Sequence, residues 1–129
     1  MINIPSANDR PLSPHLQVYR LLINMVMSMM HRVTGAVLYL GTLLLAWWLA
    51  AAAFSPEQFA FINWLLGGWP GTLVLIGFTW AVLHHLIGGI RHFIWDAGYG
   101  FDLKWVDRLS WGSLVLSLAL TALLWWAAY

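Results

Sequence analysis

The stretch that decides the fold is residues 71–96, GTLVLIGFTWAVLHHLIGGIRHFIWD. It contains no Asp, Glu, Lys or Arg before Arg91, and about 20 predominantly apolar residues in a helix are enough to cross a bilayer core. The stretch belongs to a charge-free interval, residues 58–90, and further intervals without these charges cover residues 33–56 and 109–129. The three intervals predict a membrane protein of the all-α class with three transmembrane helices.

The composition of the whole chain excludes several other classes of protein. Of the 129 residues, 61% are hydrophobic and 9% are charged, against roughly half and a quarter in soluble domains, which excludes a large water-soluble catalytic domain. A formal net charge of +1 supplies no basic patch for nucleic acid. The absence of cysteine excludes disulfides and iron–sulfur ligation, so any metal must be held by histidine or carboxylate.

Proline, glycine and serine residues that tend to end helices set the limits of the three predicted spans. The first runs from about residue 24 to 54, where Ser55-Pro56 provides a stop signal. Gly67-Gly68 and Pro70-Gly71 place a loop before the second span, residues 71–95, and a loop from Gly98 to Arg108 precedes the third, residues 109–129. We therefore predict a polar N-terminal arm, residues 1–23, and one three-helix membrane domain, residues 24–129.

The distribution of basic residues predicts the orientation in the membrane. Lysine and arginine stand before or near the start of the first predicted span and near the end of the second or after it, and none lies in residues 55–70: Arg10, Arg20, Arg32, Arg91, Lys104 and Arg108. The positive-inside rule places the N-terminal arm and the second loop in the cytoplasm. The arm has no apolar segment of the kind found in signal peptides, so we expect a multi-pass protein of the bacterial inner membrane.

This topology brings the polar residues of two spans to one level of the membrane. Ser28, His31 and Arg32 stand near the start of the first span, and His85, Arg91, His92 and Asp96 stand near the end of the second. Ionisable groups at membrane depth are costly and usually face a bundle interior or a cavity. Their convergence predicts a functional site near the cytoplasmic side.

The second span carries a candidate haem ligand. His85, Gly88, Gly89, His92 and Asp96 share one helical face. An imidazole beside two glycines, which leave room for a flat macrocycle, suits axial ligation of haem iron. The alternative is that the glycines allow another helix to pack closely while the histidines form hydrogen bonds across it.

Two other histidines of this span fit the same iron poorly. His84 is turned by about 100° from His85, so both side chains cannot point to one iron. His92 lies two turns from His85, roughly 10 Å along the axis. The choice between His84 and His85 stays open at this point.

The first span carries a set of hydrogen-bond donors on one face, namely Ser28, His31 and Arg32, followed by Gly35. Such donors can hold haem propionates or polarise a quinone carbonyl. The alternative for Arg32 is a boundary arginine that obeys the positive-inside rule. Asp96 can relay protons to a reduced quinone or merely pair with Arg91 or His92.

Three segments, in this order, resemble the cytochrome b-type membrane anchors of succinate dehydrogenase, or complex II. Residues 10–19, RPLSPHLQVY, are similar to the family pattern R-P-L-S-P-H-L-x-x-Y, and residues 28–35, SMMHRVTG, to S-x-x-H-R-x-[ST]-G. Residues 85–96, HLIGGIRHFIWD, are similar to H-x-x-x-G-x-R-H-x-x-x-D. The resemblance covers nearly the whole chain.

The resemblance implies a role for each candidate residue. His85 would be one axial ligand of a haem b shared with a second small anchor subunit, the two chains forming a heterodimeric helical bundle. His31 and Arg32 would approach the haem propionates. Ser28 and Arg32 would line the ubiquinone site, and Asp96 would lie close to it.

The resemblance also implies how the chain takes part in respiration. The arm and the cytoplasmic loop would dock on an iron–sulfur subunit, which receives electrons from a flavoprotein subunit that oxidises succinate. The anchor would pass these electrons to ubiquinone, joining the tricarboxylic acid cycle to the respiratory chain, and would catalyse nothing by itself. The alternative is a structural anchor without a cofactor. Fumarate reduction is the same chemistry in the opposite direction, which the anchor does not set.

Overall fold

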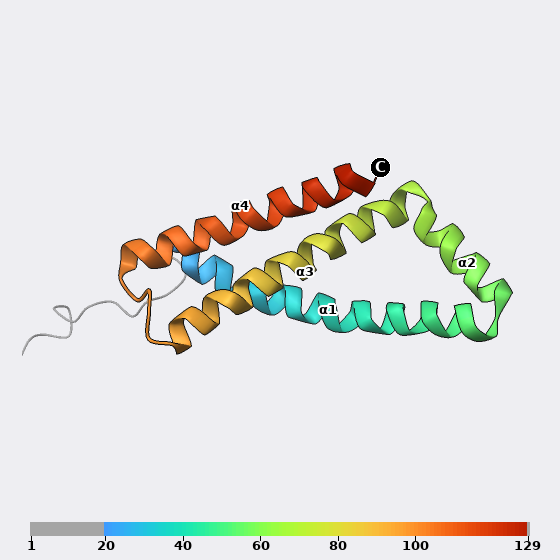
Figure 1. Cartoon of the computed structure of the whole chain (residues 1–129), viewed down its shortest axis with the longest axis horizontal. Coiled ribbons are helices and arrows are strands. Elements are labelled where there is room, and N and C mark those ends of the chain that lie inside the picture. The colour runs from blue at the N-terminus through green and yellow to red at the C-terminus, as the bar shows by residue number, and fades with distance from the viewer. Residues whose placement is uncertain (1–19, 129) are drawn as a thin grey trace, which may run out of the picture.

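The computed structural model describes residues 20–128, and in this part of the chain all regular structure is helical (Figure 1). Four helices follow one another: α1 (Ile23–Phe54), α2 (Pro56–Gly67), α3 (Trp69–Asp96) and α4 (Leu103–Ala128). The predicted all-α class is confirmed. Residues 1–19 of the predicted arm lie outside the described residues.

Three of these helices are long and apolar enough to cross a membrane, as predicted. With 32, 28 and 26 residues, α1, α3 and α4 are about 48, 42 and 39 Å long. Each exceeds the hydrocarbon thickness of about 30 Å. The helices therefore have to tilt or to extend into the headgroup region.

The connection between the first two spans differs from the predicted loop. Ser55-Pro56 ends α1 but immediately starts α2. The Ser55 hydroxyl accepts a hydrogen bond from the Gln58 backbone N–H at 3.4 Å, and Pro56 occupies the first helical position. Serine is a preferred N-cap and proline is favoured in a first turn, so a pair that stops one helix can begin the next.

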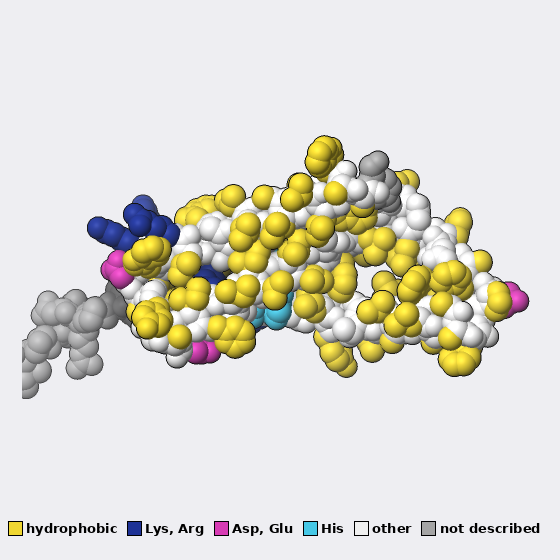
Figure 2. Space-filling view, viewed as in Figure 1, with side chains coloured by type: hydrophobic (Ala, Val, Ile, Leu, Met, Phe, Trp, Pro, Cys, Tyr) yellow, Lys and Arg dark blue, Asp and Glu magenta, His cyan; other side chains and the backbone are white. Residues whose placement is uncertain are grey.

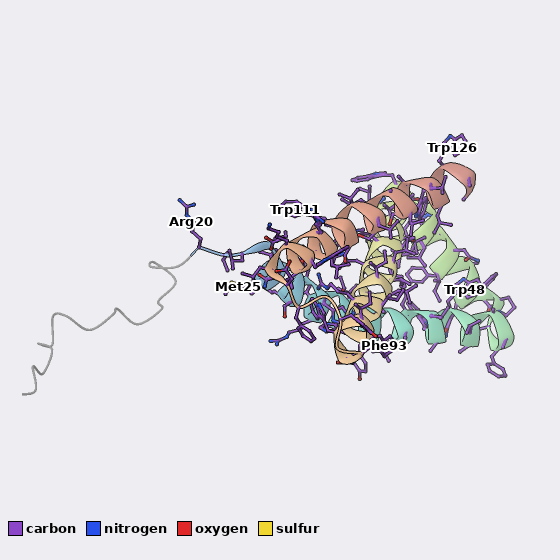
Figure 3. The ribbon with its side chains drawn as sticks, turned by 60° about the vertical axis from the view of Figure 1, so that its left-hand side comes forward. Arg20, Met25, Trp48, Phe93, Trp111 and Trp126 are labelled. Atoms are coloured by element: carbon purple, nitrogen blue, oxygen red, sulfur yellow. The ribbon has the colours of Figure 1, made fainter. Side chains whose placement is uncertain are left out.

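Side-chain hydrogen bonds hold α2 against the end of α1. The indole of Trp47 donates to Gln58 Oε1 at 3.3 Å, and that of Trp48 donates to Asn63 Oδ1 at 3.0 Å. Figure 3 shows Trp48 at the end of α1 that adjoins α2, with Met25 at the opposite end. The corner is thus a packed structural element and not a loose connection.

The other helix limits also differ from the predicted spans. Proline and glycine at positions 70 and 71 lie within the first turn of α3, where a proline costs no hydrogen bond. The loop before α4 ends at Asp102, so Lys104, Asp107 and Arg108 are helical. Charged residues mark where the apolar segment ends, but they do not end a helix, and the predicted loop was therefore too long.

Helix α3 packs against both α1 and α4, and α1 crosses α3 so that the start of α1 also contacts α4 (Figure 1). Helices α1 and α3 approach closely at Gly41, where the ring of Phe78 occupies the space of a Cβ. They diverge toward α2, and the three helices border an apolar cavity of about 910 Å³. Close approach at small residues is typical of helix packing in membranes.

The chain has little core of its own. The buried hydrophobic residues of the described part are Met27, Ala51, Ile62 and Ala81. Only 6% of the most apolar 18-residue window of α1 is buried. Figure 2 shows hydrophobic side chains along the helices and most visible charges near the ends. This surface is suited to contact with lipid and with other membrane-spanning chains.

The corner between α2 and α3 gives a stability prediction. A Cβ at Gly71 would meet the Leu65 carbonyl oxygen and the Leu66 Cα, which are backbone atoms. We expect Gly71→Ala to destabilise the fold by roughly 1–3 kcal/mol because the backbone has to shift. Gly77→Ala is the matched control, since a Cβ there has nothing within 4 Å. Thermal denaturation in detergent tests this, and equal midpoints for the two variants would contradict it.

Candidate functional site

Three histidines bring α1 and α3 together. The rings of His31 and His85 are stacked, with centroids 3.9 Å apart and planes at 12°. The His31 ring also meets the ring of His92 edge-on at 5.0 Å. The predicted convergence of polar residues from the two spans is confirmed for these three side chains.

The hydrogen bonds of His85 define which ring nitrogen carries the proton. Its Nδ1 lies 3.1 Å from the His31 carbonyl oxygen and 3.2 Å from Thr34 Oγ1. Because a carbonyl oxygen can only accept, Nδ1 is the donor and Nε2 keeps its lone pair. Nε2 has no hydrogen-bond partner among the described residues. Histidines that ligate metals are commonly held by such a bond from the other nitrogen.

The two glycines beside His85 have different surroundings. A Cβ at Gly88 would collide with the His31 ring, so Gly88 allows α1 to pack closely, as the alternative interpretation of the glycines required. A Cβ at Gly89 would have nothing within 4 Å. Of the two positions, only Gly89 leaves open space at the surface of α3.

His84 faces the opposite helix. Its side chain is 1% exposed, and its Nδ1 lies 3.2 Å from Ser117 Oγ on α4. The indole of Trp80 donates to the same hydroxyl at 3.1 Å. His84 is therefore enclosed between α3 and α4, on a different side of α3 from His85.

Arg91 is a buried cation on the same helix. It is 4% exposed, and its Nη1 donates to Ser110 Oγ on α4 at 3.2 Å. Its guanidinium carbon lies 5.0 Å from the centroid of the Trp95 ring. Three buried nitrogens at this level have no hydrogen-bond partner within residues 20–128, namely Arg91 Nε, Trp95 Nε1 and His31 Nε2.

A polar cavity of about 410 Å³ opens beside these groups. It lies between the start of α1 and the end of α3, and it is lined by Asn24, Met25, Ser28, Arg91, His92 and Trp95. Its volume is within the range of small-molecule sites, which typically combine apolar walls with a few polar groups.

The remaining predicted site residues lie at the surface. Arg32 and Asp96 are exposed, and neither makes a hydrogen bond or ion pair to another described residue. Asp96 therefore pairs with neither Arg91 nor His92. Residues 20–128 contain no cluster of three or more His, Cys, Asp or Glu that could hold a metal ion, but a haem iron needs only one ligand from each protein side.

Sequence reasoning missed the partners that hold these side chains. They include Thr34 on α1 and two hydroxyls on α4, Ser110 and Ser117, which belong to a row of buried hydroxyls together with Ser113 and Thr121. The spacing of this row is three or four residues, which is one face of a helix. Hydroxyls at that spacing in an apolar span were the signal that could have identified the row.

The hydroxyl of Ser117 gives a second stability prediction. Ser117→Ala would leave the Trp80 and His84 N–H groups without their acceptor, and an unsatisfied buried donor costs about 1–3 kcal/mol. Ser113→Ala is the control, because that hydroxyl bonds to the Leu109 carbonyl of its own helix. We expect a clearly lower denaturation midpoint for Ser117→Ala alone. A loss of the same size in both variants would argue against the role of Ser117.

Comparison with known proteins places the chain in a family. The family of succinate dehydrogenase/fumarate reductase transmembrane subunits matches residues 6–124. The succinate dehydrogenase cytochrome b556 subunit of Paracoccus denitrificans is 44% identical over 115 residues, which cover 89% of this chain and 88% of that protein. The cytochrome b556 subunit of Rickettsia felis is 40% identical over 92% of each chain.

A more distant relative shows the same extent of similarity. The succinate dehydrogenase cytochrome b560 subunit of Reclinomonas americana is 34% identical over 91% of this chain and 85% of its own length. The family match, residues 6–124, spans α1, α2 and α3 and most of α4. The chain belongs to the family of succinate dehydrogenase/fumarate reductase transmembrane subunits.

Proposed function

We propose that this chain is the cytochrome b subunit of a succinate dehydrogenase, and that it binds haem b through His85 Nε2 and passes electrons to ubiquinone. The observation that carries the haem assignment is the hydrogen bond from His85 Nδ1–H to the His31 carbonyl oxygen. This bond fixes the orientation of the imidazole and leaves the lone pair of Nε2 free to bind a metal. The relatives are named cytochromes, which agrees with a haem ligand.

The contacts of the two neighbouring histidines support His85, and not His84, as the haem ligand. His84 is enclosed by α4 and shares Ser117 with Trp80, whereas His85 faces α1 beside the small residue Gly35. A macrocycle has no access to His84 without separation of α3 and α4. Bound haem would supply one-electron transfer chemistry, and His31 and Arg32 would hold its propionates, with Arg32 free of other ion pairs.

The cavity beside Ser28 is the proposed ubiquinone site. The Ser28 hydroxyl would donate to a quinone oxygen as negative charge develops on it, which is electrostatic stabilisation of the reduction. Arg32 lies one turn further along α1 and would add positive charge. Asp96, exposed at the end of α3, would pass protons from the cytoplasmic side.

The exposed apolar surface supports the proposed assembly. A second small anchor subunit would cover part of it and complete a heterodimeric bundle around the haem, and lipid would cover the rest. The iron–sulfur and flavoprotein subunits would dock on the cytoplasmic side of a bacterial inner membrane, where the positive-inside rule predicts the N-terminus. An anchor without a cofactor is the alternative, and a haem spectrum distinguishes the two.

The haem assignment predicts the behaviour of two adjacent variants. In membranes that contain the assembled complex, His85→Ala should abolish the low-spin b-type signal in a dithionite-reduced minus oxidised optical spectrum. His84→Ala should retain that signal, because His84 binds Ser117 and not iron. Loss in His84→Ala alone would move the ligand to His84. Absence of any haem signal in the wild type would favour the anchor without a cofactor.

The quinone assignment predicts a selective loss of activity. Ser28→Ala removes one donor from the cavity, and we expect succinate–ubiquinone activity to fall about threefold to tenfold. Electron transfer from succinate to an artificial dye should be unchanged, because the dye does not need the membrane site. Thr42→Ala is the control, since that hydroxyl bonds to the Tyr39 carbonyl of its own helix. Equal losses of both activities would indicate an assembly defect and would contradict the assignment.

A further inference from the structure

Arg91 is a buried charge without a counter-charge in the described part of the chain. Its guanidinium meets the Ser110 hydroxyl and the face of the Trp95 ring, but no carboxylate pairs with it. Buried charges in proteins are normally paired and fully hydrogen-bonded, because desolvation is otherwise too costly. A buried arginine that has no counter-charge at membrane depth indicates that its partner belongs to another molecule.

Two donors of this region that lack a partner belong to residues that line one cavity. Arg91 Nε and Trp95 Nε1 are both buried, and both lack a hydrogen-bond partner in the part of the chain that the structure describes. Both residues line the 410 Å³ cavity, which lies at the end of α1 that carries Met25 (Figure 3). Two N–H groups without acceptors, one of them on a cation, fit a ligand that presents an oxygen acceptor with negative charge.

We propose that Arg91 and Trp95 bind one oxygen of the quinone and stabilise its negative charge during reduction. This inference rests on the proposed ubiquinone site and extends it to residues that the family resemblance did not assign. Succinate supplies two electrons as it becomes fumarate, and the quinone takes them with two protons to become quinol. The first electron places negative charge on the quinone oxygens, and Arg91 compensates that charge where water is scarce.

Three helices contribute residues with different roles to the proposed quinone site. Ser28 approaches the quinone from α1, and Arg91 and Trp95 approach it from α3. Ser110 on α4 does not line the cavity, but it holds Nη1 and thereby fixes the guanidinium. Ser110 is thus a positioning residue, while the two residues on α3 contact the substrate.

Trp95→Phe is the sharpest test, because it removes the Nε1–H donor and keeps an aromatic ring. The experiment uses membranes with the assembled complex and a short-chain ubiquinone as substrate. We expect kcat/KM for the quinone to fall about threefold to tenfold, with unchanged succinate–dye activity. Trp111→Phe is the matched control, since Trp111 lies exposed on α4 and outside the cavity.

Arg91→Lys tests the charge separately. Lysine keeps the positive charge but lacks the guanidinium group, whose Nη1 binds Ser110. We expect a weaker electron paramagnetic resonance signal from the half-reduced quinone and a higher KM. Arg108→Lys is the control, because Arg108 is exposed on α4. A purely structural role of Arg91 would change neither the radical signal nor KM at equal amounts of assembled complex.

The outcomes separate this inference from the proposed site. If Trp95→Phe and Arg91→Lys both keep the wild-type KM, kcat and radical signal while Ser28→Ala loses quinone activity, the quinone site stands and the inference is wrong. If none of the three variants affects quinone reduction, both are wrong. Selective loss of quinone reduction in Trp95→Phe, with normal dye activity, supports the inference.

Discussion

The stacked pair of His31 and His85 is the contact on which the arrangement of α1 and α3 depends. His31 lies in the space that Gly88 leaves open, and its carbonyl oxygen accepts the Nδ1 proton of His85. One residue of α1 thus sets both the distance between two spans and the free nitrogen of the proposed haem ligand. A change at this contact would alter packing and ligation together.

Helix α3 carries the site residues that contact both of the other long helices. Its side toward α1 carries His85, and its side toward α4 carries His84 and Arg91, each held by a serine hydroxyl. Hydrogen bonds between polar side chains across helices replace the hydrophobic core that a bundle of this size in water would need. The large apolar surface that remains exposed is therefore compatible with a defined structure once lipid and partner chains surround it.

The sequence was sufficient for the three spans and for the meeting of His31, His85 and His92, because hydropathy and helical periodicity act locally. It was not sufficient for α2, since Ser55-Pro56 is equally a stop and a start, or for the first turns of α4. Which side of α3 each histidine faces depends on acceptors in distant helices, and a single span does not reveal them. The unpartnered nitrogens of Arg91 and Trp95 were likewise visible only in three dimensions.

The buried Arg91 connects the two proposed sites through electrostatics. Haem propionates are anionic, and a quinone becomes anionic when it takes its first electron. The described part of α1 and α3 offers the cations Arg32 and Arg91 at this level of the membrane. Arg32 is exposed and can adjust to its ligand, whereas Arg91 is fixed by Ser110 and Trp95. A fixed, poorly solvated cation favours charge that develops during a reaction over charge that is already present, which suits Arg91 to the quinone and Arg32 to the propionates.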